Sequence, residues 1–174
     1  MSEFMDEYSE SLESEFRKLE EALLSEKIRL LAPSEPIKLT AETTVRETIS
    51  KMVANRRSAV VIVDGEGRLI GIFTERDVVT RIVDQGRDPE QTRLGDVMTR
   101  DPEALAPDDR ICYAMYWMTT AGYRTVPIVD SDHRPIGIAT VNDVVKWLAE
   151  LFPEAILNLR PGDKLKRPHR MDAG

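Results

Sequence analysis

Residues 57–79, RSAVVIVDGEGRLIGIFTERDVV, return 66 positions later as residues 123–145, YRTVPIVDSDHRPIGIATVNDVV. The two stretches align without a gap, and 12 of their 23 positions are identical. Extending the same offset back to Ile37 pairs apolar residues with apolar residues, namely Leu39 with Leu105, Val45 with Ile111, Ile49 with Met115 and Met52 with Met118. A repeat of this length indicates two copies of one structural unit.

Hydrophobic periodicity predicts the elements of the first copy. A helix is expected from Val45 onward, because apolar residues recur there at i, i+4, i+7 and i+8. Thr44 and Glu47 have the spacing of a capping box at its start. Two short apolar runs, residues 59–63 and 69–73, enclose a polar turn and predict a buried hairpin.

A second helix is predicted from Glu75 to Asp84, and Gly86 ends its pattern. The second copy repeats this order, with a strand, a helix, two strands and a helix predicted over residues 103–106, 110–121, 125–129, 135–139 and 141–151. Each unit is therefore β-α-β-β-α. A unit of about 50 residues is too small to cover its own sheet. We expect an α/β fold of the α+β type, in which the two repeats pack as a pseudo-symmetric pair.

The residues outside the repeats have a different character. Apolar residues recur at helical spacing from Leu12 to Leu31, which predicts an amphipathic N-terminal helix that needs a partner surface. We expect this helix to dock on the module, preferably on a second subunit; the alternative is a helix that orders only when a regulated partner binds. The predicted segments are an N-terminal extension over residues 1–32, the first repeat over 33–86, a linker over 87–96, the second repeat over 97–152 and a basic tail over 153–174.

Composition excludes several classes of protein. The chain has 174 residues, of which 41% are hydrophobic and 32% are charged, and its net charge of −7 disfavours a nucleic-acid surface. Apolar runs such as residues 59–63 are far below the roughly 20 residues of a membrane span. The acidic N-terminus does not fit a signal peptide, so a cytoplasmic location is expected. A single cysteine, Cys112, and two histidines predict neither a disulfide nor a metal site.

The chemistry of each copy is concentrated where a strand meets a helix. Residues 71–77 read GIFTERD, and residues 137–143 read GIATVND. A threonine followed three residues later by an aspartate is a capping box, and this structural role alone explains the motif. The alternative is a nucleotide site, since a helix N-terminus attracts phosphate and a carboxylate accepts hydrogen bonds from ribose hydroxyls. The two roles are compatible.

These motifs, the apolar strands ending in Asp64 and Asp130, and the string VMTRDP at residues 97–102 resemble a tandem pair of cystathionine-β-synthase (CBS) domains, or Bateman module. The resemblance covers roughly residues 33–151. It implies a stand-alone regulatory protein, such as an energy sensor, that binds AMP, ADP, ATP or S-adenosylmethionine in the clefts between its domains. It also implies a separate, unknown regulated partner and no enzymatic activity.

The resemblance also implies which residues bind the ligand. Asp77 and Asp143 match the positions that hold the ribose hydroxyls, and Arg124 matches a phosphate-binding position. Arg76 has a neutral counterpart, Asn142, so the two sites should differ. The full set of implied ligand-binding residues is Ala59, Val60, Gly71, Thr74, Arg76, Asp77, Arg124, Thr125, Val126, Pro127, Gly137, Thr140 and Asp143.

Two other functions stay open. The first is a ligand-independent dimeric scaffold whose motifs are only helix caps. The second, an enzyme, is weaker, because the sequence has no Ser/His/Asp set and no metal-ligand spacing. A homodimer is expected whether the protein is a ligand-binding module or a scaffold. The reason is that the helices carry more apolar residues than one side of a small sheet can cover. These residues are Val45, Ile49, Met52, Val53, Ile111, Met115 and Met118.

Overall fold

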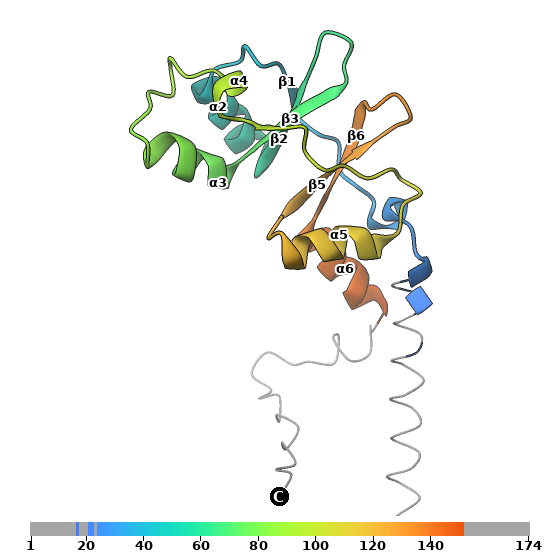
Figure 1. The fold of residues 1–174 in the computed structure, drawn as a ribbon. Helices are drawn as coiled ribbons and strands as arrows, with labels where there is room; N and C mark the ends of the chain where they lie inside the picture. The colour runs from blue at the N-terminus through green and yellow to red at the C-terminus, as the bar shows by residue number, and fades with distance from the viewer. Residues whose placement is uncertain (1–16, 18–20, 23, 152–174) are drawn as a thin grey trace, which may run out of the picture.

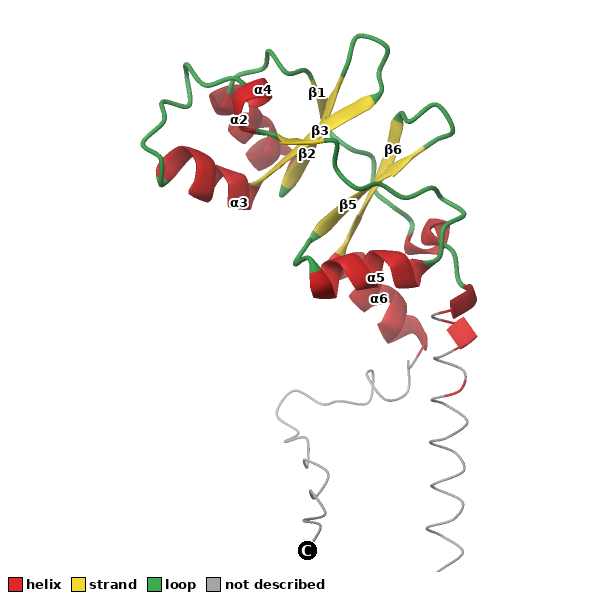
Figure 2. Cartoon of the chain, viewed as in Figure 1, coloured by secondary structure: helices red, strands yellow, loops and turns green. Residues whose placement is uncertain are grey.

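The computed structural model describes residues 17, 21–22 and 24–151, which form two α+β units (Figures 1 and 2). The 3-10 helix η1 (Ile28–Leu31) precedes the first unit, which consists of β1 (Lys38–Leu39), α2 (Val45–Asn55), β2 (Ala59–Val63), β3 (Leu69–Thr74), α3 (Glu75–Asp77) and the π-helical segment η2 (Val78–Val83). The next elements, α4 (Leu94–Val97) and β4 (Thr99–Arg100), lead into the second unit, which consists of α5 (Ile111–Thr120), β5 (Thr125–Val129), β6 (Pro135–Thr140) and α6 (Val141–Leu151). The α+β fold with two repeats is confirmed.

Each unit is built around a hairpin, and the two hairpins have the same register. β2 pairs antiparallel with β3, β5 pairs antiparallel with β6, and both ladders shift register at the residue before the strand end. The first hairpin is extended to the four-stranded order β1-β2-β3-β4. At its turn, backbone and side-chain hydrogen bonds from Arg68 lower the pKa of Asp64. Figure 2 shows the strands of both units toward the middle of the molecule, with the helices outside them.

The predicted strand over residues 103–106 is wrong in extent, since only Leu105 forms a parallel bridge, to Ile128. The corresponding segment of the first unit is held by a hydrogen bond from the Val61 N–H to the Ile37 carbonyl, of 2.9 Å. Pro127 occupies the position of Val61 in the second unit, and proline has no N–H to donate. The missing donor shortens the strand to one residue.

Two predicted helices differ from expectation, one at its start and one in its winding. Thr44 caps α2 by accepting the Glu47 N–H at 3.2 Å, but the reciprocal bond is not formed, because the Glu47 carboxylate pairs with Lys51 at 3.3 Å. The predicted capping box is therefore only half present. The helix predicted over residues 75–84 continues from α3 into the π-helical winding of η2, whereas α6 is α-helical throughout.

The two units exchange the segments that lead into them. Leu94, Val97 and Met98 precede the second unit, yet they are buried in the core of the first. Ile28 and Leu31 precede the first unit, yet they are buried in the core of the second. The strands follow the same rule, because β4 pairs with β3 and Ser34 forms a bridge with Ile138 on β6. Each core is therefore completed by the other unit's entry segment.

The N-terminal helix does not continue to Leu31 as predicted. The α-helical conformation ends at Ser25, and the extended backbone at Lys27, which forms a bridge with Arg110, separates it from the 3-10 helix η1. The Ile28 N–H donates to the Asp109 carbonyl at 2.8 Å, which turns the chain onto the second unit. These contacts lie within one chain. The expected stripe residues Leu12, Phe16, Leu19 and Leu23 and the predicted tail lie outside the described residues.

The motif glycines allow the entry segments to approach closely. A Cβ on Gly71 would collide with the Met98 side chain, and one on Gly137 would lie 2.8 Å from the Pro33 Cβ. Neither backbone is left-handed, so packing alone requires glycine here. A small apolar cluster of Val61, Leu69, Val129 and Ile138 then joins the two sheets.

Candidate functional site

A cavity of about 690 Å³ lies between the two units. One wall is formed by the end of β3 and the start of the following helix, from Ile72 to Val79. A second wall is formed by β4 and the residues that follow it as far as Glu103, and a third by the α5–β5 connection of the second unit, from Ala121 to Pro127. The cavity therefore exists only because the units pack against each other.

A nearly buried carboxylate lies in the first wall. The backbone N–H and the hydroxyl of Thr74 both donate to Asp77 Oδ2, at 2.8 and 2.7 Å, and the Asp77 N–H donates to Thr74 Oγ1 at 3.4 Å. This is the capping box that the motif predicts. Arg81 Nε lies 3.0 Å from Asp77 Oδ1. Since a carboxylate offers about four acceptor sites, Asp77 keeps one for a donor in the cavity.

The second motif has the same local geometry. Thr140 donates its N–H and hydroxyl to Asp143 Oδ2 at 2.8 and 2.7 Å, and it accepts the Asp143 N–H at 3.3 Å. At the position of Arg81 stands Trp147, which is buried in the second core. Among the described residues, Asp143 Oδ1 has no side-chain partner. The two carboxylates therefore have the same cap but different surroundings.

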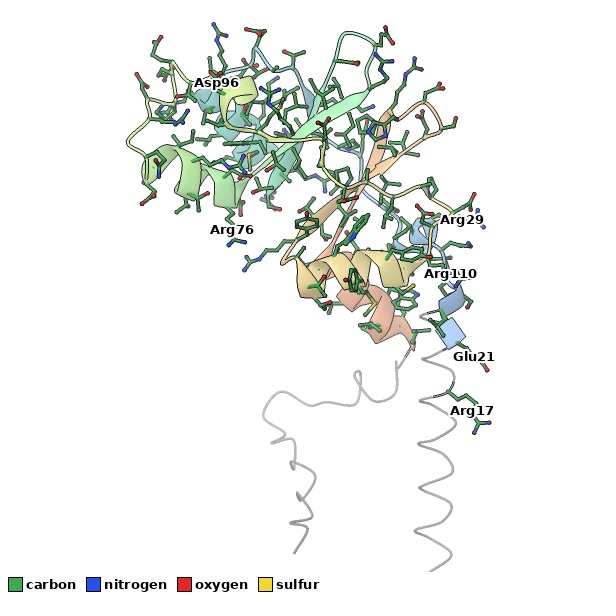
Figure 3. All side chains as sticks on the ribbon, viewed as in Figure 1. Arg17, Glu21, Arg29, Arg76, Asp96 and Arg110 are labelled. Atoms are coloured by element: carbon green, nitrogen blue, oxygen red, sulfur yellow. The ribbon has the colours of Figure 1, made fainter. Side chains whose placement is uncertain are left out.

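Charged side chains of both signs surround the cavity. Arg76 follows the motif threonine on α3, and Figure 3 shows it extending toward the second unit. Arg124 lines the opposite wall, and both arginines are exposed. Glu75 and Glu103 supply two acids to the same lining. The exposed guanidinium groups are suited to an anionic group at the cavity mouth.

Six of the residues expected from the resemblance line this cavity, namely Thr74, Arg76, Asp77, Arg124, Thr125 and Pro127. Ala59, Val60 and Val126 are buried within the sheets. Gly71 and Gly137 lie under Met98 and Pro33, as described above. Thr140 and Asp143 belong to the second motif, away from the cavity lining.

The lining also contains residues that were not expected, namely Ser58, Ile72, Glu75, Val79, Thr99, Pro102, Glu103, Ala121, Gly122 and Tyr123. Tyr123 adds an aromatic ring beside Arg124. Thr99 and Pro102 fall in the VMTRDP string, which served only to mark the start of a unit. The offset of 66 does not reveal Tyr123, because its counterpart is Arg57, whose Nη1 donates to Ser34 Oγ at 2.7 Å.

No group of three or more His, Cys, Asp or Glu side chains in the described part of the chain is placed to hold a metal ion. Within residues 17, 21–22 and 24–151, no helix is long and apolar enough to cross a membrane.

Known proteins resemble this chain in sequence. It is 36% identical over 105 residues to the uncharacterized protein MK0525 of Methanopyrus kandleri, matching 60% of this chain and 53% of that protein. It is 34% identical over 124 residues to the mitochondrial CBS domain-containing protein CBSX3 of Arabidopsis thaliana, matching 69% of this chain and 60% of that protein. The chain thus spans just over half the length of these two relatives.

Solved structures share the fold. The CBS-domain protein ATU1752 of Agrobacterium tumefaciens is 29% identical, with a TM-score of 0.61 over 66% of this chain and 90% of that one. The CBS domain protein PAE2072 of Pyrobaculum aerophilum, complexed with AMP, is 22% identical, with a TM-score of 0.65 over 72% of this chain and 98% of that one. The CBS domain pair of protein MJ0100, in complex with 5′-methylthioadenosine and S-adenosylmethionine, is 22% identical, with a TM-score of 0.63 over 71% and 99%.

The model of the CBS domain matches this sequence twice, over residues 30–84 and 94–150. The two matches coincide with the two structural units, including the short helix and strand that lead into the second one. The chain therefore belongs to the CBS domain family, of which it carries a tandem pair.

Proposed function

We propose that this chain is a regulatory CBS pair that binds an adenosine-containing ligand, AMP, ADP, ATP or S-adenosylmethionine, between its two domains. One observation carries the proposal: the Asp77 carboxylate faces a cavity that has exposed arginines on two of its walls. A carboxylate with a free acceptor site suits a ribose hydroxyl, and arginine suits a phosphate. The complexes of PAE2072 with AMP and of the MJ0100 domain pair with S-adenosylmethionine support this ligand class.

We assign the following roles within this proposal. Asp77 and the Thr74 hydroxyl hold the ribose, Arg76 and Arg124 hold the phosphate, and Tyr123 stacks on the base. The remaining members of the expected ligand-binding set are Thr125 and Pro127 in this cavity, the strand residues Ala59, Val60, Gly71 and Val126, and the second motif with Gly137, Thr140 and Asp143. The ligand supplies no chemistry of its own here, and the module acts by passing its occupancy to a separate protein rather than by catalysis.

Calorimetry with the four ligands tests the proposal. At least one ligand should bind the wild-type protein, and Asp77→Ala should weaken its binding by about tenfold or more, because a hydrogen bond to a charged group contributes roughly 1.5–3 kcal/mol. Asp143→Ala should weaken a second binding event, if both motifs bind.

Asp96→Ala is the matched control, since Asp96 is an exposed aspartate on α4 outside the cavity lining (Figure 3). It should bind as the wild type does. Absence of heat with all four ligands would reject the proposal.

A ligand-independent scaffold is the second candidate, and the completed capping boxes favour it. Both motif aspartates accept hydrogen bonds from the threonines of their own helix starts, which is a purely structural role. In that case Asp77→Ala would lower the stability by about 1 kcal/mol and change nothing else. A homodimer is part of both proposals.

A further inference from the structure

Arg81 lies one helical turn after Asp77 and just behind the cavity wall. It is not itself part of the lining, and its side chain is 39% exposed, against 12% for that of Asp77. Its Nε lies 3.0 Å from Asp77 Oδ1. Its Nη1 donates to the Val97 carbonyl at 2.6 Å, and its Nη2 donates to Thr99 Oγ1 at 2.8 Å.

The three contacts join three separate segments of the chain. Asp77 belongs to the helix after β3, Val97 ends α4, and Thr99 lies on β4, the strand that leads into the second domain. The carbonyl at the end of a helix has no intrahelical partner, so Arg81 satisfies a group that would otherwise stay free. The rigid fork of a guanidinium fixes the relative positions of all three partners.

The cap of the helix does not require Arg81. Thr140 and Asp143 make the same cap with distances equal within 0.1 Å, although Trp147 replaces the arginine. The counterpart of Thr99 is Pro33, which has no hydroxyl. The second domain therefore lacks both the arginine and the threonine hydroxyl. The contacts that Arg81 makes with Asp77, Val97 and Thr99 are found only beside the cavity of the first motif.

The geometry of Asp77 shows how an occupant would affect this linkage. Its Oδ2 is used twice by Thr74 and its Oδ1 once by Arg81, so a hydroxyl that enters from the cavity shares Oδ1 with the arginine. Thr99 lines the same cavity while accepting from Arg81. The helix after Asp77 is wound as a π-helix, a form that is found preferentially at functional sites.

We propose that Arg81 is a positioning residue that holds the Asp77 carboxylate ready for a ribose hydroxyl and ties it, through Val97 and Thr99, to the segment that joins the two domains. This inference rests on the proposed function. Occupation of the cavity is then felt directly at α4 and β4. Arg81 also offsets the charge of Asp77, which would otherwise repel an anionic ligand.

The first test uses the free protein and needs no ligand. Arg81→Gln should speed amide hydrogen exchange at residues 97–100 by about tenfold or more, because three anchoring bonds are lost. Arg87→Gln is the control, an exposed arginine just after the same helix, and it should leave this exchange unchanged. If amide hydrogen exchange at residues 97–100 is unchanged in Arg81→Gln, the proposed connection between Arg81 and the segment that joins the two domains is overturned.

The second test measures AMP binding by calorimetry. Arg81→Gln should weaken it about tenfold, and combining this change with Asp77→Asn should give less than the sum of the two effects, since Arg81 acts through Asp77. Arg81→Lys keeps the charge but not the fork, so it should restore part of the AMP affinity without restoring slow exchange at residues 97–100. The positioning role is overturned if the effects of Arg81→Gln and Asp77→Asn on the free energy of AMP binding simply add. It is also overturned if the AMP affinity of Arg81→Gln is within twofold of the wild type.

The outcomes separate the two proposals. If the wild type binds none of AMP, ADP, ATP and S-adenosylmethionine, the proposed function fails and the ribose half of this inference fails with it, while the exchange measurement still decides the tie. If the wild type binds AMP and Arg81→Gln does so equally well, only the inference fails.

Discussion

Gly71 illustrates at the scale of a residue how a motif position serves the fold before it serves a ligand. Its missing side chain leaves space for Met98, which enters with the segment of the other domain. Gly71→Ala should therefore lower the free energy of unfolding by about 1–3 kcal/mol, the usual effect of overpacking. Urea denaturation measures this change.

Gly65→Ala is the matched control for Gly71→Ala. A Cβ at Gly65 meets nothing within 4 Å, and its backbone is not left-handed, so stability should change little. Equal losses in the two variants would contradict the packing explanation.

The aspartate motif shows how far single residues could be predicted. Thr74 and Asp77 were found from their spacing alone, because a cap is a local structure. Tyr123 could not be found in this way, because it reaches the cavity only when the second domain packs on the first, and Thr99 reaches it only because β4 pairs with β3. Local spacing thus predicts the capped pair, the resemblance adds Arg76, Arg124, Thr125 and Pro127, and tertiary packing supplies the other ten lining residues.

At the scale of elements, η1 is part of the second core although it precedes the first domain. Ile28 is completely buried there, whereas its neighbour Leu30 is 53% exposed. Ile28→Ala should lower the free energy of unfolding by about 2–5 kcal/mol, and Leu30→Ala, two residues away in the same element, should leave it nearly unchanged. Chemical denaturation followed by the fluorescence of Trp117 and Trp147, both in the second domain, measures both variants.

The element order could be predicted because the repeat provides two independent copies of each periodicity. The limits of two elements could not be predicted, because each depends on a residue far away in the sequence. Pro127 removes the donor that would extend the strand at Leu105, and the bridge between Lys27 and Arg110 ends the N-terminal helix early. Both causes involve residues distant in sequence, so a single window of residues contains neither.

At the scale of the whole molecule, exposed apolar side chains are spread over the helices of both domains. They are Val53 on α2, Val79 and Val83 on η2, Tyr113 and Tyr116 on α5, and Val145 on α6, all at least 50% exposed. Such a surface favours association with a second copy. Light scattering should give a mass of about twice 19.7 kDa at micromolar concentration.

Charged substitutions test which surface carries this association. Tyr116→Glu combined with Val145→Glu should shift the protein toward the mass of one chain. Ile136→Glu changes an equally apolar, 46% exposed residue on β6, away from the helices, and should leave the mass unchanged. A wild-type mass of one chain would reject the homodimer.

The exchange of entry segments also determines when each core can fold while the chain is being synthesised. The first core is complete once Met98 has left the ribosome, because Met98 is the last of its members in the sequence. The second core needs Ile28, among the first described residues to emerge, together with Trp147, among the last. The nascent chain must therefore keep an apolar segment unburied while more than a hundred further residues are made, and this delay gives a chaperone or a neighbouring nascent copy its opportunity to bind.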